Sequence, residues 1–367
     1  MKKIIALLLS LTLVMSMLVA CGKKDAAEPT ADPTTAPTSA PAADDKKDDA
    51  ATTDTTTEAA AAKTGLAVIN SIAKSKNAAA DADGLAEVDS TVVAVLVGQD
   101  GKILKCSIDV AQTKVNFSTE GKLTTDIATA FQSKQELKDG YGMKKASGIG
   151  KEWNEQADAF EAYVIGKTVD EVKGIALNEE GKASGADLTA SVTVHINEFI
   201  DAIDKAVANA QDMGAKETDK LGLGIATNIA KSKDATADAA GLAQAYSYYT
   251  VTTTDADGKI TSCIIDASQG NVNFDATGVI TSDLTVAPQT KQELKDAYGM
   301  KKASGIGKEW YEQANAFAAY VTGKTVAEVS GIAMTEGVPS VADLTSSVTV
   351  HATDFVATIE KSVANAQ

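Results

Sequence analysis

The chain has 367 residues, of which 44% are hydrophobic, and a formal net charge of -16; its 34 basic residues are all lysines. An acidic chain without arginine argues against a nucleic-acid partner and against docking on anionic lipid, because both surfaces are recognised through basic side chains. The net charge otherwise indicates only solubility.

The first 20 residues have the pattern of a secretion signal. Lys2 and Lys3 precede an apolar run, which ends in a lipobox at Leu18-Val19-Ala20-Cys21. This segment is too short for a permanent transmembrane helix. It resembles bacterial lipoprotein signal peptides, which implies cleavage before Cys21 and acylation of the Cys21 thiol. The alternative is an ordinary secretory signal with an incidental cysteine.

Residues 21–64 are expected to be a lipidated cysteine followed by a disordered tether. From Gly22 to Thr64 the chain is mostly Ala, Thr, Asp, Lys and Pro, with no large apolar side chain. Such a segment cannot bury enough surface to offset its conformational entropy. We therefore expect the domains to stand in solution at the extracytoplasmic face of the cell membrane, held there by acyl chains.

The rest of the chain contains one domain twice. Lys134–Trp153 returns as Lys291–Trp310 with a single change, Gly140 to Ala297, and weaker similarity extends on both sides. The offset is 157 residues and falls to 156 after a deletion near Glu179. A period this long indicates duplication of a whole domain rather than a solenoid. The expected boundaries are repeat 1 at 65–211, a linker at 212–221 and repeat 2 at 222–367.

Each repeat is expected to begin with an antiparallel sheet. The segment 66–76 fits either a strand or a helix. A hairpin with an Asp-Gly turn is predicted for 91–97 and 102–110, and again for 248–254 and 259–267. A further short strand is predicted at 115–117.

The second half of each repeat changes to helical spacing. A helix is predicted from Trp153 to near Gly166, a short one at 169–172, and a last one at 197–210 after a strand at 191–195. Strands followed by helices indicate the α+β class, with two tandem copies. Each copy is long enough for its own core.

Cysteine and histidine indicate no metal or catalytic centre. Cys106 and Cys263 occupy equivalent strand positions and are expected to be buried free thiols. His195 and His351 are the only histidines, and we expect a structural role for them. No Ser-His-Asp set, paired-carboxylate motif or metal-hydrolase motif is visible in the sequence.

Two short stretches in each repeat suggest a binding site. Gly148 and Gly150, with Gly305 and Gly307 in repeat 2, precede the helices that begin at Trp153 and Trp310; this pattern fits either a tight turn or a backbone that approaches a ligand closely. The second stretch is Ser184–Thr189, with Val341–Ser346 as its counterpart, which fits either an Asx or Ser/Thr turn or a cradle for phosphate or sugar.

The order of these elements resembles the bacterial FMN-binding domain of Rnf- and Nqr-type oxidoreductase subunits and of extracytoplasmic flavin lipoproteins. The resemblance rests on Asp-Gly-Lys-Ile, Gly-Ile-Gly, the Trp helix, Gly-Lys and Ser-Gly-Ala, and it spans nearly all of each repeat. It implies FMN as cofactor and an envelope redox partner. The cofactor residues it implies are Gly148, Gly150, Trp153, Thr189, Gly305, Gly307, Trp310 and Thr345.

One departure from that family bears on how flavin would be held. The family's site reads Ser-Gly-Ala-Thr-x-Thr-Ser, and its first threonine carries FMN through a phosphoester bond; this chain has Asp187 and Asp343 there. A carboxylate cannot form that bond, so any flavin is expected to be non-covalent. Trp153 and Trp310 fit equally well as packing anchors between helix and sheet. Lys144, Lys145, Lys301 and Lys302 fit solvated lysines or a phosphate contact.

The leading expectation is a membrane-anchored binding and electron-transfer module, in which flavin supplies the chemistry. The alternative is a cofactor-free structural or small-ligand-binding surface lipoprotein.

Overall fold

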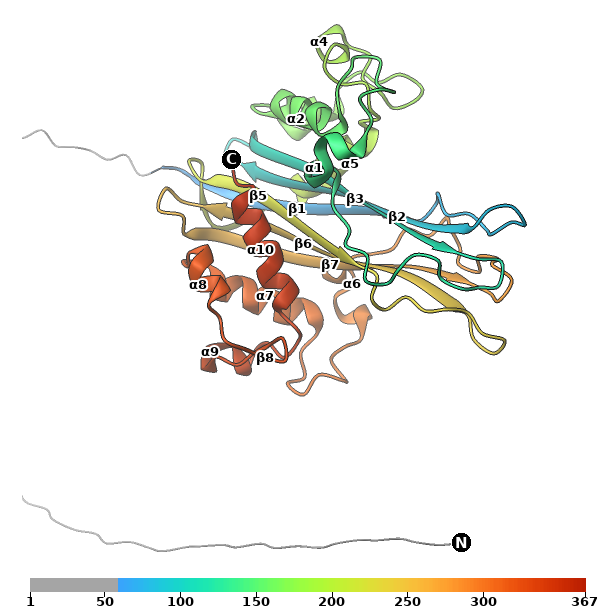
Figure 1. Ribbon diagram of the computed structural model, residues 1–367. Coiled ribbons are helices and arrows are strands. Elements are labelled where there is room, and N and C mark those ends of the chain that lie inside the picture. Colours follow the sequence, from blue (N-terminus) through green and yellow to red (C-terminus); the bar gives the residue numbers. More distant parts are fainter. Residues whose placement is uncertain (1–58) are drawn as a thin grey trace, which may run out of the picture. The chain divides into compact units, whose positions relative to one another are not determined.

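The computed structural model describes residues 59–367, so the expected leader, Cys21 and most of the expected tether lie outside the described residues (Figure 1). Contacts group residues from Thr57 to Gln367 into one compact unit. The chain is α+β, as predicted: in each repeat an antiparallel sheet comes first and helices follow.

Repeat 1 consists of three long strands and then five short or medium α-helices with a 3-10 turn. Their bounds are β1 Ala61–Ser71, β2 Gly84–Val97, β3 Ile103–Phe117, α1 Lys134–Leu137, η1 Lys138–Tyr141, α2 Trp153–Val164, α3 Val169–Lys173, α4 Ala186–Thr189 and α5 Asn197–Ala208.

Repeat 2 has the same order after a short connecting strand, β4. The elements are β4 Gln211–Lys216, β5 Lys220–Asn228, β6 Gly241–Thr254, β7 Ile260–Phe274, α6 Lys291–Leu294, η2 Lys295–Tyr298, α7 Trp310–Val321, α8 Val326–Ser330, β8 Met334–Thr335, β9 Val338–Pro339, α9 Ala342–Thr345 and α10 Thr353–Ala364.

The predicted hairpins are present, and their strands are longer than expected. β2 pairs with β3 and β6 with β7, and the turn glycines Gly101 and Gly258 have φ of 79° and 77°, a conformation that glycine adopts without strain. The ambiguous segment 66–76 is largely strand β1. The separate strand predicted at 115–117 is wrong, because β3 continues without a break to Phe117.

Other expectations also differ from the structure. The predicted strand at 191–195 is absent. Gln156 Oε1 accepts hydrogen bonds from the Thr193 and Val194 amides, so a side chain takes the place of the acceptors that a neighbouring strand would supply. β1 begins at Ala61, inside the expected tether. The expected linker 212–221 contains most of β4, which pairs with the start of β1.

Each sheet is buried on both faces. On β2, Val93 and Val95 join the core beneath the helices of repeat 1, whereas Val92 and Ala94 join a second core with Leu223 and Val251 of repeat 2. Because side chains alternate along a strand, one apolar run supplies both cores. The helices of each repeat cover the outer face of its own sheet, and the two inner faces pack on each other (Figure 1). The two repeats therefore share the core between their sheets, while each also has a core beneath its own helices.

A buried polar cluster lies between the two sheets. The Tyr249 hydroxyl is 2.9 Å from Ser90 Oγ and 2.8 Å from Ser268 Oγ, and Ser90 Oγ donates to Asn70 Oδ1 at 2.7 Å. Asn70 Nδ2 donates to the Pro288 carbonyl at 2.9 Å. These bonds link the two repeats. A shift of one sheet over the other would leave these buried polar groups without partners, which would lower the stability of the fold.

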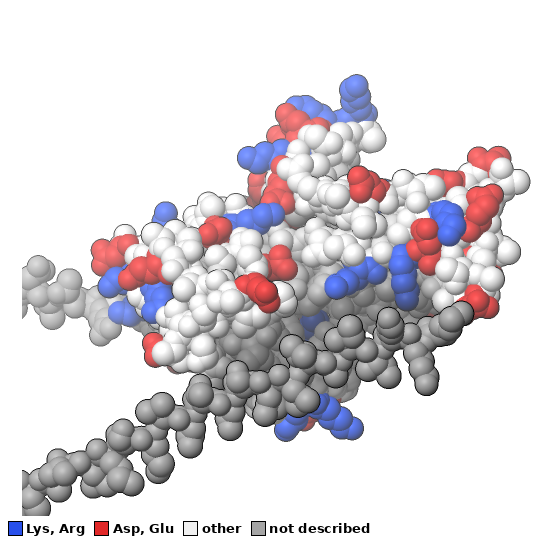
Figure 2. Space-filling model, turned by 60° about the horizontal axis from the view of Figure 1, so that its bottom comes forward, with Lys and Arg blue, Asp and Glu red and all other residues white. Residues whose placement is uncertain are grey.

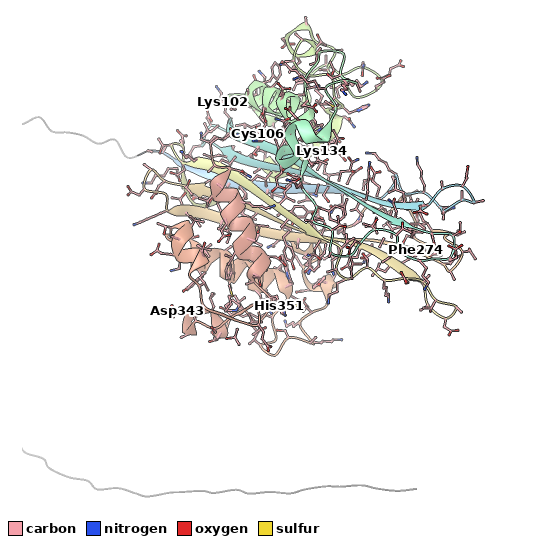
Figure 3. All side chains as sticks on the ribbon, viewed as in Figure 1. Lys102, Cys106, Lys134, Phe274, Asp343 and His351 are labelled. Carbon is pink, nitrogen blue, oxygen red and sulfur yellow. The ribbon has the colours of Figure 1, made fainter. Side chains whose placement is uncertain are left out.

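Beyond the helices, the ends of the strands form a further shared core. The rings of Phe117 and Phe274 stack with centroids 4.2 Å apart and planes 6° apart. The rings fit because Gly84 and Gly241 have no Cβ, which would lie 2.3 Å from the Phe117 and Phe274 rings, respectively. Figure 3 shows Phe274 in this part of the strands, away from the helices. Each repeat thus completes the hydrophobic core of the other at these equivalent positions.

Cys106 and Cys263 are free and buried, as predicted. Burial raises the pKa of the Cys106 and Cys263 thiols, so neither is a reactive thiolate at neutral pH.

Phe117→Ala should destabilise the chain by about 3 to 5 kcal/mol, because it removes both a buried ring and its stacking partner contact. The measurement is the free energy of unfolding from denaturant titration. Ile127→Ala is the matched control, since Ile127 is half exposed and should change stability by less than ~0.5 kcal/mol. Equal effects of the two substitutions would contradict the shared core.

A buried carboxyl group makes stability depend on pH. Glu161 on α2 is 5% exposed and accepts a hydrogen bond from the Ile108 amide at 2.6 Å. Burial, and then the charge of Asp158, raise the Glu161 pKa from 4.5 to about 8. The folded state therefore holds a proton that the unfolded state releases between these two values, so the contribution of Glu161 to stability is largest below pH 4.5 and is lost as the pH rises towards 8.

Glu161→Gln should flatten this pH dependence, because the amide keeps an acceptor for Ile108 and does not ionise. At pH 8.5 we expect the variant to be more stable than the parent chain by on the order of 2 kcal/mol, and at pH 4.5 nearly equal to it. Thermal unfolding across this pH range is the measurement. Parallel pH profiles for the two proteins would show that Glu161 does not titrate in this way.

Candidate ligand site

Repeat 1 contains a pocket of about 570 Å³ on the outer face of its sheet, beside the helices. Its walls come from residues 89–91 of β2, residues 110–112 of β3, the 141–148 loop, and the segment that leads into α5. We call it the repeat 1 pocket; the lining residues used below are Lys74, Asp89, Thr91, Lys134, Tyr141, Gly148, Trp153, His195, Glu198 and Phe199. Its volume is within the range typical of small-molecule sites, ~300 to 1,000 Å³.

Glu152 folds the loop that forms one wall. Its buried carboxylate accepts hydrogen bonds from the Met143 and Lys144 amides at 2.8 and 3.0 Å, and it also caps the start of α2. A carboxylate at a helix N-terminus is favoured by the helix dipole. The same glutamate therefore fixes the helix and the loop together.

Gln156 joins that loop to the segment before α5. Its side chain is fully buried; Nε2 donates to Ser147 Oγ at 3.1 Å, and Oε1 accepts from the Thr193 amide at 2.7 Å. Gln313 makes the equivalent bonds in repeat 2, to Ser304 and Thr349. The glycine turn and the last loop of each repeat are thus neighbours.

Gly148 and Trp153 line the pocket, while Gly150 and Thr189 are not among its lining residues. A Cβ at Gly148 would meet open space, whereas Gly150 has a φ of 64° and serves the turn itself. Trp153 is 4% exposed and packs edge-on against Phe199 at 5.9 Å, so it anchors α2 as well as forming a wall.

The Ser-Gly-Ala loop lies elsewhere. Asp187 and Thr189 are exposed on the short helix α4, and Asp187 accepts a hydrogen bond from the Tyr163 hydroxyl at 2.6 Å. This bond raises the pKa of Tyr163 and lowers that of Asp187. In repeat 2, Thr345 donates to the Ala342 carbonyl, and Figure 3 shows Asp343 on the helical side of that repeat. The structure does not bring Thr189 into the repeat 1 pocket.

Asp89, which lines the pocket, has one buried carboxylate oxygen without a partner in the part of the chain that the structure describes. Asp89 is 7% exposed; its Oδ2 accepts from Lys74 Nζ at 2.7 Å, but its buried Oδ1 has no hydrogen-bond partner among the described residues. Leaving a buried acceptor unpaired costs about 1 to 3 kcal/mol. An N–H or O–H donor of a ligand would remove this cost.

Lys134 supplies a cation to the pocket. Its Nζ lies 4.8 Å from the Tyr141 ring centroid and 5.2 Å from that of Trp153. Lys134 is on α1, next to the sheet of repeat 1 in Figure 3. Glu198, which accepts from Thr91 Oγ1 at 2.8 Å, and the exposed His195 complete the polar groups. The pocket therefore combines aromatic walls, an unpaired acceptor and a lysine.

In repeat 2 the equivalent space is filled by two tyrosines. Tyr246 and Tyr248 stand where repeat 1 has Asp89 and Thr91, and their rings stack at 4.7 Å. Lys291, the counterpart of Lys134, is 2% exposed, lies over the rings of Tyr246, Tyr298 and Trp310, and donates to the Tyr246 hydroxyl. Burial lowers the Lys291 pKa to about 7.

The glycines of repeat 2 behave as in repeat 1. Gly305 borders open space and Gly307 has a φ of 63°. Trp310 is 3% exposed and packs against Phe355 at 5.6 Å. The repeats thus share the turn and the tryptophan, and differ at the two tyrosines.

Sequence reasoning missed Asp89, Lys74 and Lys134. Asp89 and Thr91 differ between the copies, and this difference was the available signal. Charged side chains of both signs are interspersed over the face shown in Figure 2. Within residues 59–367, no cluster of His, Cys, Asp and Glu is arranged to hold a metal ion.

Comparisons with known proteins give one short match. The chain is 58% identical over 41 residues to a chlorophenol reductase from Desulfitobacterium hafniense, and the match covers 11% of this chain and 12% of that protein. No known protein family and no solved structure matches the chain. In the part of the chain that the structure describes, no helix is long and apolar enough to span a bilayer.

Proposed function

We propose that repeat 1 binds one FMN non-covalently, and that the chain is a lipid-anchored extracytoplasmic module that exchanges electrons with an envelope redox partner. The supporting observation is the contrast between the copies: the pocket is open beside Asp89 in repeat 1 and filled by Tyr246 and Tyr248 in repeat 2. Repeat 2 then binds no flavin and has a structural role. For this repeat alone, the two tyrosines favour the cofactor-free alternative.

The groups in the repeat 1 pocket suit the parts of FMN. Lys134, which has no carboxylate within ion-pair distance among the described residues, would pair with the phosphate. Asp89 Oδ1 would accept from a ring N–H or a ribityl hydroxyl, and Tyr141 and Trp153 would give apolar contact to the ring system. Bound flavin would supply the redox chemistry, while these side chains hold and orient it.

The proposal differs from the family pattern in the residues used. Thr189 and Asp187 lie outside the pocket, so Asp187 does not face the phosphate and no phosphoester bond is involved. Gly150, Gly305, Gly307, Trp310 and Thr345 have no part in the binding proposed here. The short match to a chlorophenol reductase fits redox chemistry, but it covers too little of either chain to carry the proposal.

FMN binding should have a stoichiometry of one per chain, measured by quenching of flavin fluorescence with the Cys21→Ser chain. Asp89→Tyr with Thr91→Tyr copies repeat 2 into repeat 1 and should abolish binding, because two rings fill the site. Tyr246→Asp with Tyr248→Thr is the reciprocal variant and should add a second site. Failure of the folded parent chain to bind FMN or riboflavin would overturn the proposal.

Lys134→Met distinguishes the contribution of the FMN phosphate to binding from that of the flavin ring. If Lys134 pairs with the phosphate, FMN affinity should fall by roughly tenfold or more, since hydrogen bonds to charged groups contribute about 1.5 to 3 kcal/mol. Riboflavin, which lacks the phosphate, should bind the variant and the parent alike. Equal losses for both ligands would assign Lys134 to packing instead.

The anchor is tested in cells. The parent chain should fractionate with the membrane, and mass spectrometry should find acyl chains on Cys21. Cys21→Ser should release the protein from the membrane, because two or more acyl chains supply the attachment. A parent chain recovered without acylation would leave the ordinary secretory signal as the correct reading.

A further inference from the structure

A second pocket, of about 740 Å³, lies between the repeats and has a smaller counterpart of about 470 Å³ at the equivalent position. The larger, which we call the junction pocket, is formed by β1 and the end of α5 from repeat 1, with β7, α6 and α7 from repeat 2. The smaller, the counterpart pocket, is formed by the same elements with the repeats exchanged. The two pockets can therefore be compared residue by residue.

Most of the surrounding structure is the same in both. Lys205 Nζ donates to the Val68 carbonyl at 2.6 Å and pairs with Glu293 at 2.5 Å in the junction pocket. Lys361 does the same with the Ile225 carbonyl and Glu136 in the counterpart. The difference in volume must come from a few other positions.

Two substitutions on α7 distinguish the junction pocket. Ala318 replaces Glu161, and Asn315 replaces Asp158. In the counterpart pocket Glu161 Oε1 accepts from the Ile108 amide of edge strand β3 at 2.6 Å. Ala318 has no acceptor for Ile265, the equivalent residue of β7. Beyond Cβ, a glutamate has one methylene and one carboxylate more than an alanine, which is the size of acetate.

The substitutions also change the charge of the pocket. The counterpart is lined by four carboxyl groups, those of Asp109, Glu136, Asp158 and Glu161. The junction pocket has two, Asp266 and Glu293, while the lysines correspond in both: Lys205 and Lys295 at the junction, Lys361 and Lys138 at the counterpart. Asn315 Oδ1 accepts from Gln292 Nε2 at 2.8 Å, which leaves the Asn315 amide N–H groups as donors. In the counterpart, burial and the Asp158 charge raise the Glu161 pKa to about 8; Asn315 replaces Asp158 in the junction pocket and removes that charge, so a carboxylate is repelled less there.

We propose that the junction pocket binds a small carboxylate ligand whose carboxylate takes the place occupied by the Glu161 side chain in the counterpart pocket. The Asn315 side chain, which lines the pocket, is one donor to this carboxylate, and the amide of Ile265, a buried residue between the lining residues Ile264 and Asp266, is the other. The proposal is independent of flavin binding, because the junction pocket shares no lining residue with the repeat 1 pocket.

Acetate, propionate and longer monocarboxylates are the probes, with acetamide as the uncharged control. In the [15N]isoleucine-labelled chain, the Ile265 amide resonance should shift saturably, with a dissociation constant on the order of 1 mM for acetate, because so few atoms limit affinity. The Ile108 resonance, whose amide is already bonded to Glu161, should not shift.

Ala318→Glu should abolish the Ile265 shift, because its own side chain then occupies the site. If that variant does not fold, Ala318→Gln tests the same occupancy without a buried charge. Glu161→Ala with Asp158→Asn should create the reciprocal site and make Ile108 respond. An Ile265 shift that persists in a folded Ala318 variant, the absence of saturation, or shifts spread over the whole chain would overturn the proposal.

Discussion

The contact between the inner faces of the two sheets is the constraint on which the rest of the molecule depends. Three strands from each repeat present apolar side chains on both faces, so neither sheet can leave its inner face in water. Packing the two faces together commits the outer faces to the helices. It also places the repeat 1 pocket on the outer face, beside the helices, and brings β1 next to β7 to form the junction pocket.

The order of elements and their class could be predicted from sequence because their signals are local. The Asp-Gly turn sets the hairpin, and the spacing of Trp153, Ala157 and Phe160 sets α2. The pairing of the sheets was missed because the Val92–Val97 run fits one buried strand in any setting; only its lack of alternation indicated a second core. The strand predicted at 191–195 failed because one buried side chain, Gln156, satisfies its backbone.

The candidate site was predicted in part, for a related reason. Gly148 and Trp153 belong to a turn and a helix start that local sequence reveals, and both reach the pocket. Asp89 and Lys134 reach it only through tertiary structure, since one is on β2 and the other on α1. Positions that are identical in the two repeats pointed to the glycine turn as the site, but that turn is a structural feature of both repeats. The informative positions are those at which the copies differ, Asp89 against Tyr246 and Glu161 against Ala318.

Duplication explains how such differences arise without loss of the fold. In each related pair of sites, the protein's own side chains occupy space in one copy that is open in the other: Tyr246 and Tyr248 on the outer face of repeat 2, and Glu161 in the smaller counterpart pocket. Filling a hollow adds buried contact and removes unpaired polar groups, both of which favour stability. The partner hollows keep an unpaired Asp89 oxygen and, with Ala318 in place of Glu161, no side-chain carboxyl group opposite the Ile265 amide. The copy that carries the larger side chains shows that the fold tolerates them. Their absence from the other copy is therefore the feature that supports the two ligand sites proposed above.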